Sequence, residues 1–355
     1  MRSFWRYVAV ALAALGVPGC GSTPGSAGGP ASDTLLPVNG TELYVHREGT
    51  GPPVLVVHGG PLLDHGYLVE PFRPLATEFQ LVFYDQRLSG RSAGSVDSAS
   101  VRLDSFVTDI EALRQALGLG RIHLVGHSWG GLLAMRYAIT HGEQLRSLVL
   151  LSPIPPSAEL WQEEQRARAA ALEPEDTAGM AALRRSEAVA AGDPEAIEAL
   201  LRMSYRSQLH DPSRADQLDF HVPDDYRARS RQLGAMRPDL EAFDLRDGLA
   251  SIPVPTLLVY GGDEVGQRIG RDALVAALPR STAVAIADAG HFPFLERPAE
   301  LRRVVRAFLA GVEHGQHVAW GDSVAPVLAE SGPAPAQDTA RVVRLRREMV
   351  RRQIE

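Results

Sequence analysis

Lysine is absent from this chain of 355 residues, so arginine supplies all of its 36 basic side chains. Acidic side chains number 43, and the formal net charge of −7 gives no reason to expect a nucleic-acid partner. A single cysteine, Cys20, excludes an internal disulfide and a metal site of the usual thiolate kind. Phosphate loops, dinucleotide fingerprints and the H-E-x-x-H zinc motif are also missing, so we expect neither a cofactor nor a metal.

The one cysteine stands at the end of a candidate export signal. Residues 1–6 carry two arginines, residues 7–17 form an apolar run too short to span a bilayer, and Gly19 directly precedes Cys20. This order resembles a bacterial lipoprotein signal, in which the cysteine becomes the lipidated first residue of the mature protein.

We therefore expect residues 1–20 to be a lipoprotein-type signal peptide and residues 21–33, rich in glycine, serine and proline, to be a flexible linker. The protein would then be extracytoplasmic, with the lipid as its only attachment to a membrane. Pro18 is unusual in such a cleavage site, so ordinary secretory cleavage and an uncleaved anchor stay open.

The pattern around Ser128 predicts a strand, a sharp turn and a helix. Residues 122–125 are a continuous apolar run, and residues 132–137 continue as a buried helical pattern. Gly126 and Gly130 flank the serine in a G-x-S-x-G pattern, where a strained turn leaves no room for a Cβ on either side. The hydroxyl would project from the top of a sheet, which makes Ser128 a candidate nucleophile.

Apolar strands alternate with helices along most of the chain. An Asn39-Gly40 turn joins the first two candidate strands into a hairpin, which we expect at an antiparallel edge. The fully apolar strands that follow predict a mostly parallel sheet with helices on both faces, an α/β fold. The expected strands are residues 34–38, 42–47, 54–57, 81–84, 122–125, 148–151, 256–260 and 282–286, and a closing helix covers residues 298–309.

The alternation stops in residues 153–251, which are helical in pattern, charged and rich in alanine and arginine. We interpret this segment as a helical cap inserted between two parts of the core, residues 34–152 and residues 252–312. Residues 313–355 are expected to be a linker and a basic tail. The tail pattern is compatible with an anionic membrane surface or with docking on the protein, and favours a solvated helix.

A nucleophilic serine needs a base, and the base needs an acid to orient it. Three histidines, His58, His127 and His291, stand at strand ends, and only His291 comes late enough in the chain for the order Ser, acid, His. The acid is expected in the loop after the strand at residues 256–260, where Asp263 and Glu264 are neighbours. Either carboxylate can orient an imidazole; aspartate is the commoner choice, which favours Asp263.

The oxyanion of a tetrahedral intermediate requires two backbone donors. One is expected from the N–H of Trp129, directly after the serine, and the other from the H-G-G loop after the third strand. Gly60 is the better candidate there, because Pro61 has no N–H. Residues 85–87 are expected to brace this loop through hydrogen bonds, and a purely structural loop is an equally fair interpretation of them.

Three motifs carry a resemblance to a known family. They are G-H-S-W-G-G at residues 126–131, H-G-G-P at residues 58–61 and Y-D-Q-R-L-S-G-R-S at residues 84–92. Together they resemble the proline iminopeptidase group of α/β-hydrolases over roughly residues 35–312, which implies the α/β-hydrolase fold with an inserted cap. Leu62 and Leu88 stand where that group has glycine, near the expected mouth of the site, so the substrate stays open.

The leading hypothesis is a serine hydrolase that acts through an acyl-enzyme on a small-molecule or short-peptide substrate. The resemblance implies a prolyl aminopeptidase-like peptidase, with a carboxylesterase or lactonase as the alternative. A different class, a surface lipoprotein that keeps the fold only for binding, is disfavoured because Ser128, His291 and a carboxylate are all retained.

An aminopeptidase has to recognise a free α-ammonium group, and buried carboxylates from the cap can do so through charge-assisted hydrogen bonds. We expect at least one cap acid to face the pocket. The candidates are Glu159, Glu163, Glu164, Asp219, Asp224 and Asp225.

Overall fold

The structure is a computed structural model and describes residues 31–316. The expected signal peptide with Cys20, most of the expected linker and the basic tail lie outside this range. Within residues 31–316, no helix has both the length and the hydropathy needed to cross a membrane.

The core is one sheet of eight strands in the order β1-β2-β4-β3-β5-β6-β7-β8. β1 pairs with β2 and β2 with β4 in antiparallel fashion, and all other neighbours are parallel, so the predicted antiparallel edge is confirmed. Every expected strand is present, with bounds that differ by a few residues. The strands are β1 (Ser32–Val38), β2 (Thr41–Glu48), β3 (Pro53–Val57), β4 (Gln80–Tyr84), β5 (Ile122–His127), β6 (Leu145–Leu151), β7 (Thr256–Gly261) and β8 (Ser281–Ile286).

The hairpin of β1 and β2 forms as its turn sequence predicts. Asn39 and Gly40 have φ angles of 47° and 72°, the left-handed values that a two-residue hairpin turn requires at both positions. The ladder extends back to Ser32, which pairs with Arg47. The expected linker is therefore too long by two residues, because Ser32 and Asp33 already belong to the sheet.

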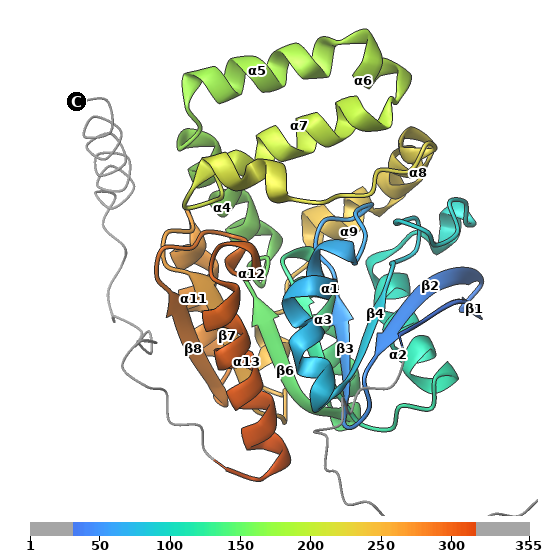
Figure 1. The fold of residues 1–355 in the computed structure, drawn as a ribbon, viewed down its shortest axis with the longest axis vertical. Coiled ribbons are helices and arrows are strands. Elements are labelled where there is room, and N and C mark those ends of the chain that lie inside the picture. The colour runs from blue at the N-terminus through green and yellow to red at the C-terminus, as the bar shows by residue number, and fades with distance from the viewer. Residues whose placement is uncertain (1–30, 317–355) are drawn as a thin grey trace, which may run out of the picture.

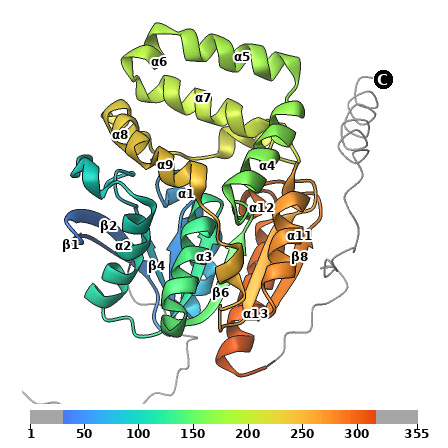
Figure 2. The same ribbon diagram turned by 180° about the vertical axis from the view of Figure 1, so that it is seen from behind.

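Helices cover both faces of the sheet, as Figures 1 and 2 show from opposite sides. One apolar cluster joins the sheet to α2, α3 and α11, and a second joins it to α1 and α13. In α13 the buried side chains Leu301, Val304, Val305 and Phe308 recur at helical spacing, which explains why this segment folds as an amphipathic helix. The core helices are α1 (Gly66–Phe72), α2 (Leu103–Ala116), α3 (Trp129–His141), α11 (Gln267–Ala277), α12 (Pro293–Glu296) and α13 (Pro298–Glu313).

Seven α-helices lie between β6 and β7, and we call these helices, together with the loops that join them, the cap. Figure 1 shows α5, α6 and α7 above the sheet, while α4 descends toward α11. The side chain of Ser157 accepts a hydrogen bond from the N–H of Leu160 and so caps the start of α4. The cap helices are α4 (Ala158–Ala170), α5 (Pro174–Arg185), α6 (Glu187–Ala191), α7 (Pro194–Arg206), α8 (Tyr226–Leu233), α9 (Arg237–Ala242) and α10 (Arg246–Leu249).

Candidate active site

Ser128 occupies the sharp turn between β5 and α3, with φ 52° and ψ −114°. This is a strained conformation for a residue with a side chain. A Cβ on Gly126 would lie 2.4 Å from the carbonyl oxygen of Gly130, and a Cβ on Gly130 would lie 2.2 Å from that of Val57. The predicted need for glycine at both positions is confirmed, because a side chain at Gly126 would push α3 away from β5 and one at Gly130 would push α3 away from the end of β3.

His291 follows β8, and its Nδ1 lies 2.6 Å from Oε1 of Glu264, which follows β7. Both side chains are buried. His291 also lines the same cavity as Ser128, a space of about 360 Å³ beneath the cap. Because Nδ1 is engaged by Glu264, Nε2 is the nitrogen left to exchange a proton with the serine.

The preference for Asp263 as the orienting acid is wrong. Asp263 directs Oδ2 to Nδ1 of His210 at 2.8 Å, and 45% of its side chain is exposed. The Asp263 N–H donates to the carbonyl of Ala289, which anchors the turn so that Glu264 alone reaches the imidazole. Asp263, His210 and Asp288 bring three possible ligand atoms within 4.8 Å of one another, a grouping that the sequence did not lead us to expect.

The charges around this pair suit a general base. Burial opposes ionisation of Glu264, but His291 and Arg168 outweigh it and hold the pKa of Glu264 below its usual value. Burial lowers the pKa of His291, Glu264 offsets part of this effect, and Arg168 lowers the pKa further. Near neutral pH the carboxyl group is therefore ionised and the imidazole is neutral.

Gly60 and Trp129 both line the cavity beside Ser128. In the described part of the chain, the N–H groups of Gly60 and Trp129 have no hydrogen-bond partner. The N–H of Trp129 belongs to the first residue of α3, where the helix dipole favours negative charge. Two backbone donors without a partner within residues 31–316 therefore belong to residues that line the cavity with Ser128.

The loop after β3 is held by hydrogen bonds to Gln86 and Asp85. Gln86 donates from its amide side chain to the carbonyl of His58 at 2.7 Å and from its backbone N–H to Nε2 of His58 at 3.1 Å. The indole N–H of Trp129 donates to Oε1 of Gln86 at 2.8 Å, which joins this loop to the turn at Ser128. The predicted bracing role is confirmed for Gln86.

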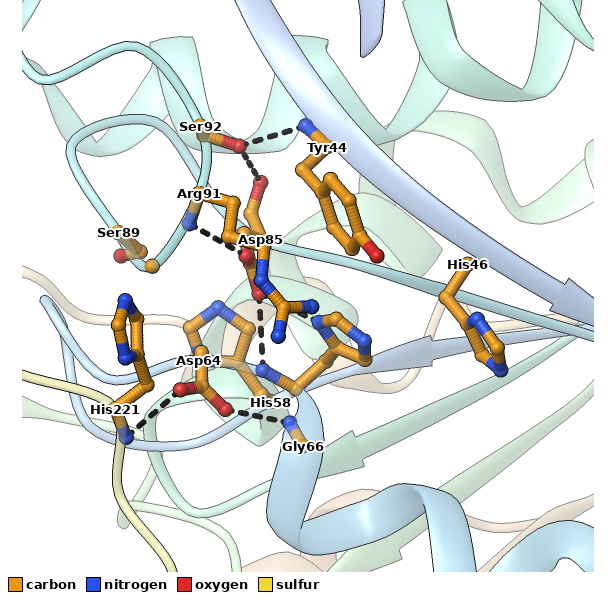
Figure 3. A network of polar contacts seen from close by, with 12 residues as sticks. Tyr44, His46, His58, Asp64, Gly66, Asp85, Ser89, Arg91, Ser92 and His221 are labelled. Carbon is orange, nitrogen blue, oxygen red and sulfur yellow. Dashed lines mark hydrogen bonds and ion pairs between the residues drawn. The ribbon is translucent and has the colours of Figure 1, made fainter. Parts of the chain in front are cut away.

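Figure 3 shows the continuation of this network around Asp85 and Asp64. Asp85 Oδ1 accepts from the backbone N–H of His65 at 3.0 Å and contacts its Nδ1 at 2.6 Å. Asp64 accepts from the N–H of Gly66 and from the N–H of His221 in the cap. Arg87, in contrast, turns away to α2, where it pairs with Asp109, so the bracing role predicted for Arg87 is wrong.

Leu62 and Leu88, which stand where the family pattern has glycine, both adopt a backbone conformation that favours glycine. Their φ angles are 78° and 64°, in the left-handed region that favours glycine. Both side chains are buried in the main apolar cluster and do not line the cavity. The expectation that they lie at the mouth of the site is therefore wrong, because the loop turns their side chains into the core.

Among the six candidate cap acids, Glu164 lines the cavity with Ser128. Burial raises the pKa of Glu164 to about 8, an effect that Arg168 opposes and Glu264 increases. The other five point elsewhere: Glu163 and Asp224 are exposed, Glu159 pairs with Arg246, Asp225 pairs with Arg229, and Asp219 lines a separate cavity of about 90 Å³.

Arg168 is the residue at this site that sequence reasoning missed. It extends from α4 to both Glu164 and Glu264, at 2.7 and 2.9 Å. Arg168 follows Glu164 by four residues, a spacing from which the pair on one helix face could have been predicted. The contact with Glu264 could not have been predicted in this way, because it joins segments 96 residues apart.

Comparisons with known proteins agree with this geometry. A family model described as the alpha/beta hydrolase fold matches residues 52–298. The chain is 28% identical over 273 residues to the proline iminopeptidase of Heyndrickxia coagulans, covering 75% of this chain and 93% of that protein. The crystal structure of the proline iminopeptidase of Mycobacterium smegmatis matches with a TM-score of 0.61 at 24% identity, covering 80% of this chain and 99% of that one.

A thermophilic esterase from Thermogutta terrifontis also matches, with a TM-score of 0.55 at 25% identity, over 80% of this chain and 99% of that one. The family model spans more than half of the sequence, and the mostly parallel sheet with helices on both faces is the fold that it describes. This chain therefore belongs to the α/β-hydrolase fold family, in which it is a hydrolase similar to the proline iminopeptidases.

Proposed function

We propose that this chain is a serine hydrolase that acts through an acyl-enzyme on a small-molecule or short-peptide substrate, as a prolyl aminopeptidase-like peptidase. The observation that carries the proposal is the contact between Glu264 and His291 at the cavity that Ser128 also lines. We further propose that the helices within residues 153–251 act as the cap over residues 34–152 and 252–312.

In the proposed mechanism, His291 takes the proton of Ser128 through Nε2 as the serine oxygen attacks the substrate carbonyl carbon. Glu264 stabilises the imidazolium that forms, and the N–H groups of Gly60 and Trp129 bind the oxyanion. His291 then protonates the leaving group as its bond to the carbonyl carbon breaks. His291 then takes a proton from water as the water oxygen attacks the carbonyl carbon of the acyl-enzyme. The bond to Ser128 breaks, His291 returns the proton to the serine oxygen, and the acid product leaves.

Two observations support an aminopeptidase. The relatives from Heyndrickxia coagulans and Mycobacterium smegmatis carry the name proline iminopeptidase. Glu164 places a buried carboxyl group on the wall of the cavity. Its pKa of about 8 leaves it largely protonated near neutral pH, and a substrate ammonium group would favour its ionised form through a charge-assisted hydrogen bond.

One observation favours the second candidate, a carboxylesterase or lactonase. Oε1 of Glu164 already lies 2.7 Å from the guanidinium of Arg168, and the pKa of Glu164 of about 8 keeps this carboxyl group largely protonated near neutral pH, so the empty pocket offers little free negative charge. A neutral ester needs no free carboxylate in the pocket. A non-catalytic surface lipoprotein is the least favoured reading, because a binding module has no use for the arrangement of Ser128, His291 and Glu264.

The experiment compares proline p-nitroanilide with its N-acetylated form and with short-chain p-nitrophenyl esters. An aminopeptidase cleaves the free amine far faster than the acetylated substrate, and Glu164→Gln removes much of that preference. Equal rates on the two anilides, with esters far better than either, would transfer the assignment to a carboxylesterase.

The serine mechanism is tested separately with a fluorophosphonate probe. Wild type and Ser230→Ala, which changes an exposed serine on α8, should be labelled and active. Ser128→Ala should be folded, unlabelled and inactive on every substrate. Labelling or turnover by Ser128→Ala would show that the nucleophile lies elsewhere.

A further inference from the structure

The guanidinium of Arg168 connects the cap to the base of the proposed triad. Its Nη2 lies 2.7 Å from Oε1 of Glu164 and 2.9 Å from Oε1 of Glu264. Its Nη1 donates to Oε1 of Gln208 at 2.6 Å. Only 13% of the Arg168 side chain is exposed, so these contacts are largely shielded from water.

We propose that Arg168 is a positioning residue of this hydrolase, whose guanidinium holds Glu264 against His291 and links the orientation of the imidazole to the docking of the cap. The inference rests on the proposed function, since it assigns Glu264 and His291 to the triad.

The contact with Glu264 restrains the one carboxylate oxygen that matters for orientation. Oε1 of Glu264 receives both Nη2 of Arg168 and Nδ1 of His291. A glutamate side chain has one more rotatable bond than an aspartate, so it needs an additional partner to hold one geometry. Arg168 supplies that partner, and its positive charge also offsets the repulsion that Glu164 would exert on Glu264 whenever Glu164 is ionised.

The cap holds His291 by a second route. The backbone N–H of His291 donates to the carbonyl of Gln208 at 2.7 Å, and the side chain of the same glutamine accepts from Arg168. Gln208 follows α7, whereas Arg168 is on α4. Two separate segments of the cap therefore meet at the imidazole, so a cap that moves away would release both the backbone and the acid of His291.

The positive charge of Arg168 should affect the pKa of His291, and this effect can be measured. The charged and titratable groups around His291 are Glu264 after β7, Arg168 and Glu164 on α4, and His127 at the end of β5. Burial lowers the pKa of His291, and the positive charge of Arg168 lowers it further, with Nη2 3.4 Å from Nδ1. Removing that charge should raise the pKa of His291. Because a loss of burial would raise this pKa as well, the effect of charge is recognised by comparison with Arg168→Lys, which keeps the positive charge.

The test measures kcat/KM against pH on a neutral p-nitrophenyl ester, so that the acidic limb reports the enzyme. In Arg168→Gln we expect this limb to move to higher pH by about one unit. Arg168→Lys keeps the charge and should return the limb close to wild type, with kcat still reduced because an ammonium group cannot reproduce the guanidinium fork. Arg166→Gln, the same change at an exposed position on α4, should leave the limb and kcat unchanged.

An unchanged limb in folded Arg168→Gln, or an equal shift in Arg166→Gln, would overturn the proposal. If Arg168→Gln does not fold, Arg168→Lys decides alone: a limb and a kcat both equal to wild type would show that the guanidinium geometry does not matter. The rate of labelling by the fluorophosphonate probe, measured against pH, should show the same acidic limb without substrate turnover. Failure of wild type to react with the probe would instead contradict the proposed function.

Discussion

Oε1 of Glu264 lies 2.6 Å from Nδ1 of His291, while the adjacent Asp263 is turned to His210. Two neighbouring carboxylates thus have different partners, one buried against the imidazole and one half exposed. The turn after β7 sets this difference, so substitutions of the two acids should affect activity to different degrees.

Glu264→Gln should remove most activity, whereas Asp263→Asn should stay near wild type. Loss of the orienting carboxylate costs on the order of 10⁴ in kcat in a well-studied serine protease, because the imidazole adopts the wrong tautomer and its cation is not stabilised. The two variants change charge equally at adjacent positions, so each is the control of the other in steady-state kinetics. Equal and small effects from both would place the acid elsewhere.

His58 should make the folded protein sensitive to mild acid. Burial lowers the pKa of His58 from 6.5 to about 4, so the unfolded chain binds a proton in a range where the folded protein does not. The free energy of unfolding should therefore decrease as the pH falls from 6.5 toward 4, by about 3 kcal/mol in total for this group.

Urea unfolding at neutral and mildly acidic pH measures this loss, and His58→Gln provides the comparison because it cannot titrate. The variant should lose less stability than wild type over the same pH interval. An identical loss in both proteins would mean that His58 contributes nothing to the acid sensitivity.

Leu88 should tolerate glycine better than alanine. Both substitutions remove the same buried leucine side chain, but only glycine adopts a φ of 64° without strain. We expect Leu88→Ala to be less stable than Leu88→Gly by about 1 kcal/mol in chemical denaturation.

Leu124 on β5 is the matched control, since it is also fully buried and lies in a regular strand. There the order should reverse, with glycine worse than alanine, because glycine loses more backbone entropy on folding. The same order at both positions would contradict the strain attributed to Leu88.

Cys20→Ser should convert a membrane-anchored protein into a soluble extracytoplasmic one. The prediction follows from the arginine-rich start, the short apolar run and the cysteine, because a lipid on Cys20 would supply the attachment. Cell fractionation with detergent partitioning measures it, and Ser22→Ala in the adjacent linker should behave as wild type. Wild-type protein found wholly in the cytosol, with Met1 still attached, would refute it.

The sequence by itself determined the sheet, the hairpin and the turn at Ser128. Each of these depends on local pattern: continuous apolar runs for the buried strands, Asn39-Gly40 for the hairpin, and glycines on both sides of the serine. The chain order Ser, acid, His also selected His291 from several histidines, because the order follows from the position of the strands in the sheet.

Only the tertiary structure decided between Asp263 and Glu264, since the direction of a side chain in a short turn depends on what packs against the turn. It also turned Arg87 toward Asp109 and buried Leu62 and Leu88 away from the cavity. Arg168 is the clearest case. Its partner Glu264 lies on the other side of the cap boundary, and a contact between segments so far apart in the chain is created by the packing of α4 against α11, for which no local pattern codes.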